Sequence, residues 1–385
     1  MKAGFQYFPD NFMWSQGMMI VIEMARWGGS AMSEVDRVGR RLKDKVGDNE
    51  AWGAEWEKEA RRIEDMGDAA QKQDGYTLSA AGHYLRAATY YFVGERFVQL
   101  GPKKTELYQS CLRCFRLGIK GRYPNIERVE VPYAHEGKPT TLPAWFMKAP
   151  RPGRAPTVCF FDGLDSTKEL SILFGGVELA LRGIHTLAID GPGQGEALRL
   201  QHIPSRPDYE VPGTAAYDYL ATRRDVDPRR VAVMAYSMGG YYAPRVAAFE
   251  KRFAACIAWG GHYDYHATWI TRRKILESGG NRVSAPHFQL PWVMGMPDMD
   301  SAMKKTEAYK LEGVANKITC PFLVTHGEED SISPVANAQL LYDAVSSQKK
   351  TLKIFTAEEG GAEHCQGDNR FLGATYVADW IAANL

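Results

Sequence analysis

A serine at a strand-to-helix turn is the residue of this sequence whose surroundings most clearly indicate chemistry. Ser237 follows a short apolar run at residues 231–235, and the residues after Gly240 have a helical pattern. The small Ala235 and Gly239 lie two residues before and after the serine, where they allow a strand and a helix to approach each other. The pattern departs from G-x-S-x-G only in that alanine. It predicts a nucleophile elbow, with an ordinary turn that contains a serine as the alternative.

A serine nucleophile needs a base, and the base needs an orienting carboxylate. On this kind of sheet the chain order is serine, then aspartate or glutamate, then histidine. Residues 321–326 predict a strand that runs into an acidic loop, from which we choose Asp330. Glu328 and Glu329 stay open as alternatives, because spacing does not give loop geometry. His364 is the only histidine after this loop and is therefore the candidate base.

The oxyanion of an acyl-transfer reaction needs backbone N–H donors beside the nucleophile. One donor is expected from Met238, directly after the serine. The other is expected from the loop after the predicted strand at residues 157–161, where we choose the N–H of Leu164. Neighbouring residues that we expect to contact the substrate are Gly163, Asp165 and Tyr236.

Two histidines with an aspartate between them follow the next predicted strand, at residues 254–259. They are His262, Asp264 and His266, and we expect them to face the pocket. A role for His262 and Asp264 in binding substrate or protonating a leaving group is favoured over a metal pair, because no further ligand is evident. We expect neither a metal nor another cofactor.

The first third of the chain has a helical pattern, and we expect residues 1–123 to form a helical cap module. Apolar residues recur at helical spacing, for example Trp52, Trp56, Ile63 and Met66. Trp14 and Met18 are predicted to line an apolar pocket that accepts an aromatic group.

From residue 124 to residue 385 the pattern predicts a hairpin followed by alternating strands and helices. Such alternation indicates an α/β fold with a mostly parallel sheet and helices on both faces. About sixty residues separate two of the strands, which is far longer than the usual connection. We expect this insertion, at about residues 262–318, to form a lid over the serine.

The composition is that of an ordinary globular protein: 385 residues, 45% hydrophobic, with a formal charge of +1. This balance gives no reason to expect a nucleic-acid or membrane partner. The apolar patch at residues 12–25 lacks the features of a signal peptide and is too interrupted to span a bilayer. The six cysteines do not form a disulfide framework, so we expect a cytoplasmic protein. We expect its partner to be a small-molecule substrate, and a homodimer is compatible with these features.

Three segments resemble the α/β-hydrolase superfamily. More narrowly, they are similar to the group that contains 2,6-dihydroxypseudooxynicotine hydrolase, the fungal polyketide-shortening hydrolases and the fermentation-respiration-switch-like esterases. The segments lie at residues 161–169, 190–196 and 236–242, behind a helical N-terminal region. The resemblance implies an α/β-hydrolase fold, a helical cap and a triad of Ser237, Asp330 and His364.

The resemblance also implies a class of reaction, because members of this group include hydrolases that cleave a carbon–carbon bond beside a ketone. We therefore expect a serine hydrolase that cleaves a ketone or 1,3-diketone with an aromatic or apolar acyl part. One alternative is a carboxylesterase or an acyltransferase. A ligand receptor without catalytic activity is a further alternative, and it would require a defective triad.

Overall fold

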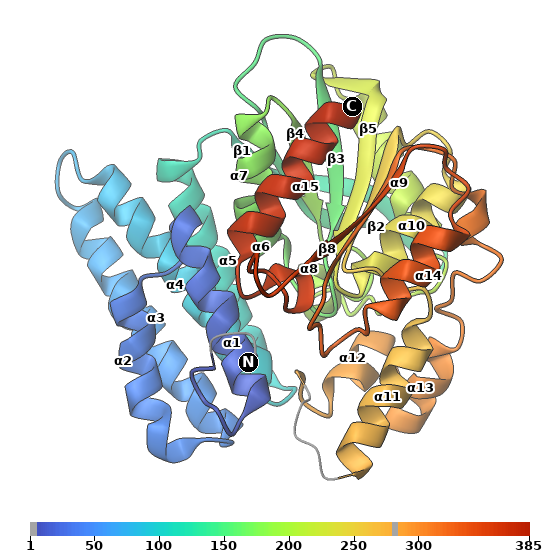
Figure 1. The fold of residues 1–385 in the computed structure, drawn as a ribbon. Helices are drawn as coiled ribbons and strands as arrows, with labels where there is room; N and C mark the ends of the chain where they lie inside the picture. Colours follow the sequence, from blue (N-terminus) through green and yellow to red (C-terminus); the bar gives the residue numbers. More distant parts are fainter. Residues whose placement is uncertain (1–5, 279–283) are drawn as a thin grey trace. The chain divides into compact units, whose positions relative to one another are not determined.

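The computed structural model describes residues 6–278 and 284–385 (Figure 1). Within them the chain forms two compact units. One unit, residues 6–126 and 284–288, is helical, and the other, residues 127–278 and 289–385, contains the sheet. The change from one unit to the other falls at the start of the first strand.

The helical unit has a core of aromatic side chains. Trp52 and Trp56 are fully buried, and their rings contact each other and those of Phe97 and Tyr90. The helices of the described part of this unit are α1 (Phe12–Glu23), α2 (Met32–Leu42), α3 (Asn49–Gln71), α4 (Thr77–Phe97) and α5 (Pro102–Arg122), with short 3-10 turns η1 (Met24–Trp27) and η2 (Lys43–Lys45). None of the helices in the described residues is long and apolar enough to cross a membrane.

One residue of the expected apolar stripe on α3 lies outside the core. Met66 is 41% exposed, whereas Ile63 is fully buried. The position one turn after Ile63 is taken by Gly67, against which the Tyr84 ring packs so closely that a Cβ atom would lie 2.9 Å from it. At this position a glycine of α3 packs against an aromatic ring of α4. The helical spacing of apolar residues does not reveal this pairing.

The second unit contains an eight-stranded sheet with the order β1-β2-β4-β3-β5-β6-β7-β8. The pairs from β4 through to β8 are parallel, and β2 pairs with β4 in the antiparallel sense. The strands are β1 (Ile126–His135), β2 (Lys138–Met147), β3 (Ala155–Phe161), β4 (His185–Ile189), β5 (Val226–Tyr236), β6 (Ala255–Trp259), β7 (Phe322–Gly327) and β8 (Lys350–Phe355). This mostly parallel sheet flanked by helices confirms the predicted fold class.

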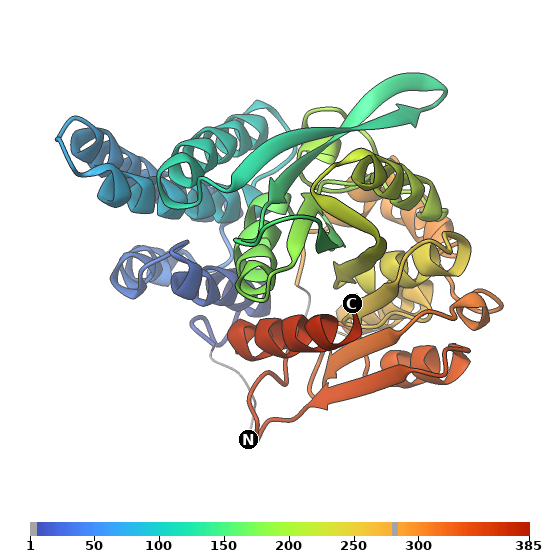
Figure 2. The ribbon, with the colours of Figure 1, turned by 90° about the horizontal axis from the view of Figure 1, so that it is seen from above.

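Both faces of the central strands are covered, and Figure 2 shows α9 and α15 on opposite sides of them. Because side chains alternate along a strand, Phe161 packs on Tyr209, whereas Phe160 contacts Phe174 on the other face. The covering helices are α6 (Lys168–Ser171), α7 (Val177–Leu181), α8 (Gly195–Arg199), α9 (Glu210–Thr222), α10 (Gly239–Phe249), α14 (Ala336–Ala344) and α15 (Arg370–Asn384).

The helical segment that follows the loop after β3 is interrupted by a π-helical turn. This turn, η3 (Ile172–Gly176), lies between α6 and α7. A Cβ atom at Gly175 would lie 2.5 Å from the Phe160 ring, so the glycine lets this turn lie close to β3. A close approach of this kind depends on a residue far away in sequence, and the helical pattern alone does not indicate it.

The long insertion between β6 and β7 is helical in its described part. Its elements are α11 (Tyr265–Glu277), α12 (Gln289–Met294), α13 (Met299–Thr306) and the 3-10 turn η4 (Ala315–Lys317). Another 3-10 turn, η5 (His364–Gln366), follows β8 and carries the candidate base. The insertion and η5 thus both begin after the carboxyl ends of sheet strands, at the edge where β5 delivers Ser237.

Candidate active site

Ser237 lies in the sharp turn between β5, which ends at Tyr236, and α10, which begins at Gly239. Its φ angle is 58°, in the left-handed region that residues with a side chain rarely adopt. The N–H of Ser237 donates a 2.8 Å hydrogen bond to the carbonyl of Trp259 at the end of β6. The neighbouring strand therefore helps to hold the serine in this strained conformation.

Small residues around the serine allow the strand, the helix and the adjacent loops to meet. A Cβ atom at Gly239 would lie 2.5 Å from the Cβ of Ala235 and 2.8 Å from the carbonyl of Asp162. At Gly240 a Cβ atom would collide with the carbonyl of Gly260. The methyl group of Ala235 fits because the residue opposite it is a glycine, so the departure from G-x-S-x-G is accommodated.

The three residues of the predicted triad form one hydrogen-bonded chain. Nε2 of His364 lies 2.7 Å from Oγ of Ser237, and Nδ1 of the same ring lies 2.7 Å from Oδ2 of Asp330. The other carboxylate oxygen of Asp330 accepts the N–H groups of Ile332 and Ser333 at 2.8 and 2.9 Å. This arrangement fixes the carboxylate and directs the imidazole toward the serine.

Electrostatics within this chain favour a charged carboxylate beside the imidazole. Burial opposes the negative charge of Asp330, but His364 and the backbone donor at Ser333 outweigh it and hold the pKa of this carboxyl below its usual value. Burial likewise opposes a charged His364, and the Asp330 carboxylate outweighs it and raises the pKa of the imidazole. A histidine in this setting can accept a proton from a serine and keep it beside a fixed anion.

A second histidine lies behind Asp330. His326 is fully buried near the end of β7, where its Nε2 is 2.7 Å from the carbonyl of Ser333 and 3.2 Å from Oδ2 of Asp330. Burial and the neighbouring His364 lower the pKa of His326, although Asp330 opposes this change. Oδ2 of Asp330 therefore lies close to two imidazole rings, of which His364 also contacts Ser237.

His262 lies beside the triad without belonging to its hydrogen-bonded chain. Its ring centroid is 6.4 Å from that of His364, and its Nδ1 is 3.2 Å from Oγ of Ser333 and 3.4 Å from Oγ1 of Thr268. Burial, followed by the positive charges of His364 and other cations, keeps the pKa of His262 well below its usual value. The residue is therefore a neutral, polar wall of the site at physiological pH.

On the other side of Ser237 lies the loop that follows β3. A Cβ atom at Gly163 would lie 2.8 Å from the Cβ of Ser237 and 3.3 Å from its Oγ, so only a glycine fits there. Leu164 is half-buried and follows directly, and Asp165 has a φ of 50° and is fully buried. Asp165 pairs with Arg199, which also donates a 2.9 Å hydrogen bond to its carbonyl.

Tyr236 braces the same loop from the preceding strand. Its hydroxyl forms a short hydrogen bond with the hydroxyl of Ser166. Its ring packs edge-on against Phe160 and Phe174. In the structure, Tyr236, a predicted substrate contact, therefore holds the loop after β3 in place.

A buried ionic cluster anchors the end of that loop. The ammonium of Lys168 is fully buried and lies 2.7 Å from Asp190, 2.8 Å from Glu169 and 3.1 Å from Glu196. Glu196 is in turn bridged by Arg128 at 2.7 Å. Two of the segments that carry the resemblance, residues 161–169 and 190–196, therefore meet in one cluster that fixes the loop beside the serine.

Comparison with known proteins shows the family to which the chain belongs. The sequence profile of the Prolyl oligopeptidase family matches residues 179–385, a range that contains Ser237, Asp330 and His364. The chain belongs to this family. It is an α/β hydrolase of the prolyl oligopeptidase family, and the helical unit and the loop after β3 lie outside the matched range.

Relatives of this hydrolase extend over nearly the whole chain. The hydrolase acrC of Aspergillus aculeatus is 31% identical and covers 93% of this chain and 92% of its own. The 2,6-dihydropseudooxynicotine hydrolase of Paenarthrobacter nicotinovorans is 28% identical over 93% of this chain and 91% of its own. The crystal structure of a 2,6-dihydroxy-pseudo-oxynicotine hydrolase shares the fold, with a TM-score of 0.78 over 96% of this chain and 95% of its own at 24% identity.

Two predicted site residues of the hydrolase have structural partners away from the triad. Asp264 accepts a 3.0 Å hydrogen bond from the N–H of Ala267 in the first turn of α11, and it lies 3.5 Å from the ammonium of Lys310. Nδ1 of His266 lies 2.8 Å from Oγ1 of Thr306. The structure thus brings His262, but neither of these two side chains, to the triad. Among the described residues no group of side chains suited to a metal ion is found.

Trp14 and Met18 are both buried in the helical unit. The indole N–H of Trp14 donates a 3.0 Å hydrogen bond to Asn49, and its ring contacts Trp52. Their contribution to a substrate pocket stays a prediction.

Some residues beside the triad have no clear signal in the sequence. Cys365 lies 3.6 Å from Nε2 of His364 and donates to the carbonyl of Trp259 at 3.3 Å. The spacing of His326 and Asp330, four residues apart at the end of a strand, is the one pattern that could have indicated their contact.

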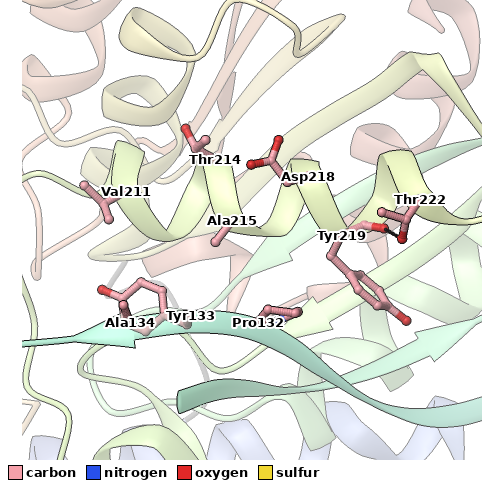
Figure 3. A pocket seen from close by; sticks show the side chains of 9 residues that line it. All are labelled: Pro132, Tyr133, Ala134, Val211, Thr214, Ala215, Asp218, Tyr219 and Thr222. Atoms are coloured by element: carbon pink, nitrogen blue, oxygen red, sulfur yellow. Dashed lines mark hydrogen bonds between the residues drawn. The ribbon is translucent and has the colours of Figure 1, made fainter. Parts of the chain in front are cut away.

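A pocket on another part of the sheet unit contains none of the site residues. It lies between β1 and α9 and has a volume of about 570 Å³ (Figure 3). The side chains that line it are Pro132, Tyr133, Ala134, Val211, Thr214, Ala215, Asp218, Tyr219 and Thr222. The candidate chemistry therefore belongs to the edge at Ser237 and not to this groove.

Proposed function

We propose that this hydrolase acts through a Ser-His-Asp triad and an acyl-enzyme. The observation that carries the proposal is the chain Ser237, His364 and Asp330, with 2.7 Å at each link. His364 takes the proton of Ser237 as Oγ attacks a carbonyl carbon, and Asp330 stabilises the imidazolium that forms. The N–H groups of Met238 and Leu164 stabilise the oxyanion. The close contact of Gly163 with Ser237 supports this assignment of the second donor.

The substrate that we propose is a ketone or 1,3-diketone with an aromatic or apolar acyl part. In this reaction the bond between the attacked carbonyl carbon and the next carbon breaks, and its electron pair passes to an enolate. The imidazolium of His364 returns its proton to that enolate, which leaves as a ketone. Water, deprotonated by the same histidine, then releases the acyl group as a carboxylic acid. The resemblance to hydrolases that cleave carbon–carbon bonds supports this choice.

A carboxylesterase or an acyltransferase is the second candidate, and the same triad supports it. The two candidates differ in the leaving group. Cleavage of an ester releases an alkoxide, whose charge is on oxygen, whereas cleavage of the carbon–carbon bond releases an enolate, whose charge is shared between oxygen and carbon. Product analysis with benzoylacetone and with 4-nitrophenyl butyrate distinguishes them. Cleavage of benzoylacetone to benzoate and acetone, or to acetophenone and acetate, supports the first candidate. Rapid turnover of the ester with the diketone untouched supports the second.

The triad itself is tested by labelling with a fluorophosphonate probe, read by intact mass. The wild-type protein should gain one adduct, and Ser237→Ala should gain none. Ser346→Ala changes an exposed serine and serves as the matched control, which should label like the wild type. A folded Ser237→Ala protein that still gains the adduct would refute the assignment of the nucleophile.

A further inference from the structure

One face of α11 presents large polar and aromatic side chains to the interior of the sheet unit. Tyr265, Trp269 and Arg272 are spaced by four and three residues and therefore share this face. All three are buried, and Arg272 is only 7% exposed. The next residue, Arg273, points outward and pairs with Glu277 and Asp300.

Arg272 has few partners for a buried cation. Its guanidinium stacks over the Trp269 ring at 4.6 Å, and Nη2 donates a single long hydrogen bond, 3.4 Å, to the carbonyl of Ile332. Within the described residues, no carboxylate lies within ion-pair distance of it. In the part of the chain that the structure describes, the other N–H donors of this guanidinium have no protein partner and are free to meet a ligand.

Other deeply buried cations of this chain are matched by acids. Lys168 lies among Asp190, Glu169 and Glu196, and Lys104 pairs with Glu95 at 2.9 Å. Burying a charge without a partner costs several kcal/mol, and here burial lowers the pKa of Arg272 in spite of Tyr265 and Asp330. Because the fold pairs its other buried cations, the unmatched guanidinium points to a ligand as its partner.

The position of Arg272 relates it to the triad. The carbonyl that it contacts belongs to Ile332, whose N–H is held by Asp330. Thr268, on the same helix, contacts His262, whose ring lies 6.4 Å from that of His364. The guanidinium therefore lies on the side of the site that holds Asp330 and His262.

We infer that Arg272 binds a negatively charged, delocalised oxygen group of the substrate. This inference rests on the proposed function, because it assigns the residue to the same reaction. The group is either a carboxylate that the substrate carries or the enolate that carbon–carbon cleavage generates. Both are planar anions whose charge is spread over several atoms, and a guanidinium donates parallel hydrogen bonds to such groups. Arg272 is then a specificity residue in the first case and stabilises the leaving group in the second.

The test compares Arg272→Met and Arg272→Lys with the wild type on three substrates. Mono-4-nitrophenyl glutarate carries a carboxylate, 4-nitrophenyl butyrate is its neutral counterpart, and benzoylacetone releases an enolate. Arg273→Met removes the neighbouring exposed arginine and is the matched control. Turnover of the neutral ester reports in every variant how much folded, active enzyme is present.

If the partner is a carboxylate, Arg272→Met should lower kcat/KM for the glutarate ester relative to the butyrate ester by about 10- to 100-fold, mainly through KM. If the partner is an enolate, the same variant should lower kcat for benzoylacetone relative to the butyrate ester by a similar factor. Arg272→Lys, which keeps a charge but loses the planar fork, should restore part of either loss. Arg273→Met should leave both ratios unchanged.

The inference is overturned if Arg272→Met changes all substrates by one common factor, or changes none of them. That result would assign the arginine to the packing of α11. A failure of the proposed function looks different, because the wild type would then neither take the fluorophosphonate label at Ser237 nor hydrolyse the neutral ester.

Discussion

The two loops that flank Ser237 are held in place in different ways. The loop after β3 ends in a buried cluster in which Lys168 is surrounded by Asp190, Glu169 and Glu196. The loop after β7 is centred on Asp330, whose charge is shared among backbone N–H groups and two histidine rings. One loop is fixed by a buried lysine among three carboxylates, and the other by hydrogen bonds to the carboxylate that contacts His364. The first arrangement suits a rigid oxyanion site, and the second suits proton transfer.

The largest expected effect lies on the side of the β7 loop. Asp330→Asn should lower kcat/KM by about 10,000-fold with little change in thermal stability, because an amide holds the imidazole in the wrong tautomer. Steady-state kinetics and a melting curve measure both quantities. Glu328→Gln changes an acid of the same loop that accepts a hydrogen bond from the N–H of Ala357, away from the triad, and it should stay within about threefold of the wild type. The reverse ranking of these two variants would assign the acid to Glu328.

On the side of the β3 loop the main effect should be on stability. Lys168→Met leaves the buried acids without their cation and should lower the free energy of unfolding by about 3–5 kcal/mol. Unfolding in denaturant measures this free energy. Lys353→Met removes a more exposed ion pair with Glu359 and should cost no more than about 1 kcal/mol. If both lysine variants are equally stable, the cluster does not anchor this loop.

A smaller kinetic effect is expected from the histidine behind Asp330. His326→Gln removes an imidazole that lies 3.2 Å from the carboxylate, and it should lower kcat about 10-fold while KM stays nearly constant. A fall in the melting temperature without any change in kcat would assign His326 to packing alone. The kcat and KM values of the purified variant, compared with its melting temperature, separate these outcomes.

The pH profile should show the smallest and most specific change. Asp330 raises the pKa of His364, and only the neutral imidazole accepts the serine proton, so kcat/KM should rise with pH through this raised pKa. Removing the carboxylate in Asp330→Asn lowers the pKa of His364. The acid limb of the residual activity should therefore move to lower pH. A limb that stays in place, or moves to higher pH, would contradict the coupling of the two residues.

Much of the fold and of the order of the site could be predicted from the sequence. Alternating strands and helices indicated the parallel sheet, and the chain order of Ser237, Asp330 and His364 follows from where loops meet the carboxyl ends of its strands. The structure brings these three side chains into hydrogen-bonding contact. Their catalytic role stays a prediction until it is measured.

Other features could not be predicted because they depend on contacts between distant parts of the chain. Met66 is exposed, whereas the next residue, Gly67, packs against the Tyr84 ring, and no local pattern shows that ring. Asp264 seemed suited to the pocket by its position after β6, but its carboxylate caps α11 and meets Lys310. Arg272 looks in the sequence like an ordinary helical arginine next to Arg273, but it is buried whereas Arg273 is exposed and pairs with Asp300.

The measurement that tests the central claim most directly is the rate of fluorophosphonate labelling at Ser237 in the wild type and in His364→Ala. If the histidine activates the serine, the wild type should label at Ser237 in a reaction that quickens as pH rises, and His364→Ala should label at least about 1,000-fold more slowly. Peptide mapping locates the adduct, and a melting curve shows that the variant is folded. Equal rates in the two proteins, or an adduct on a residue other than Ser237, would contradict the triad.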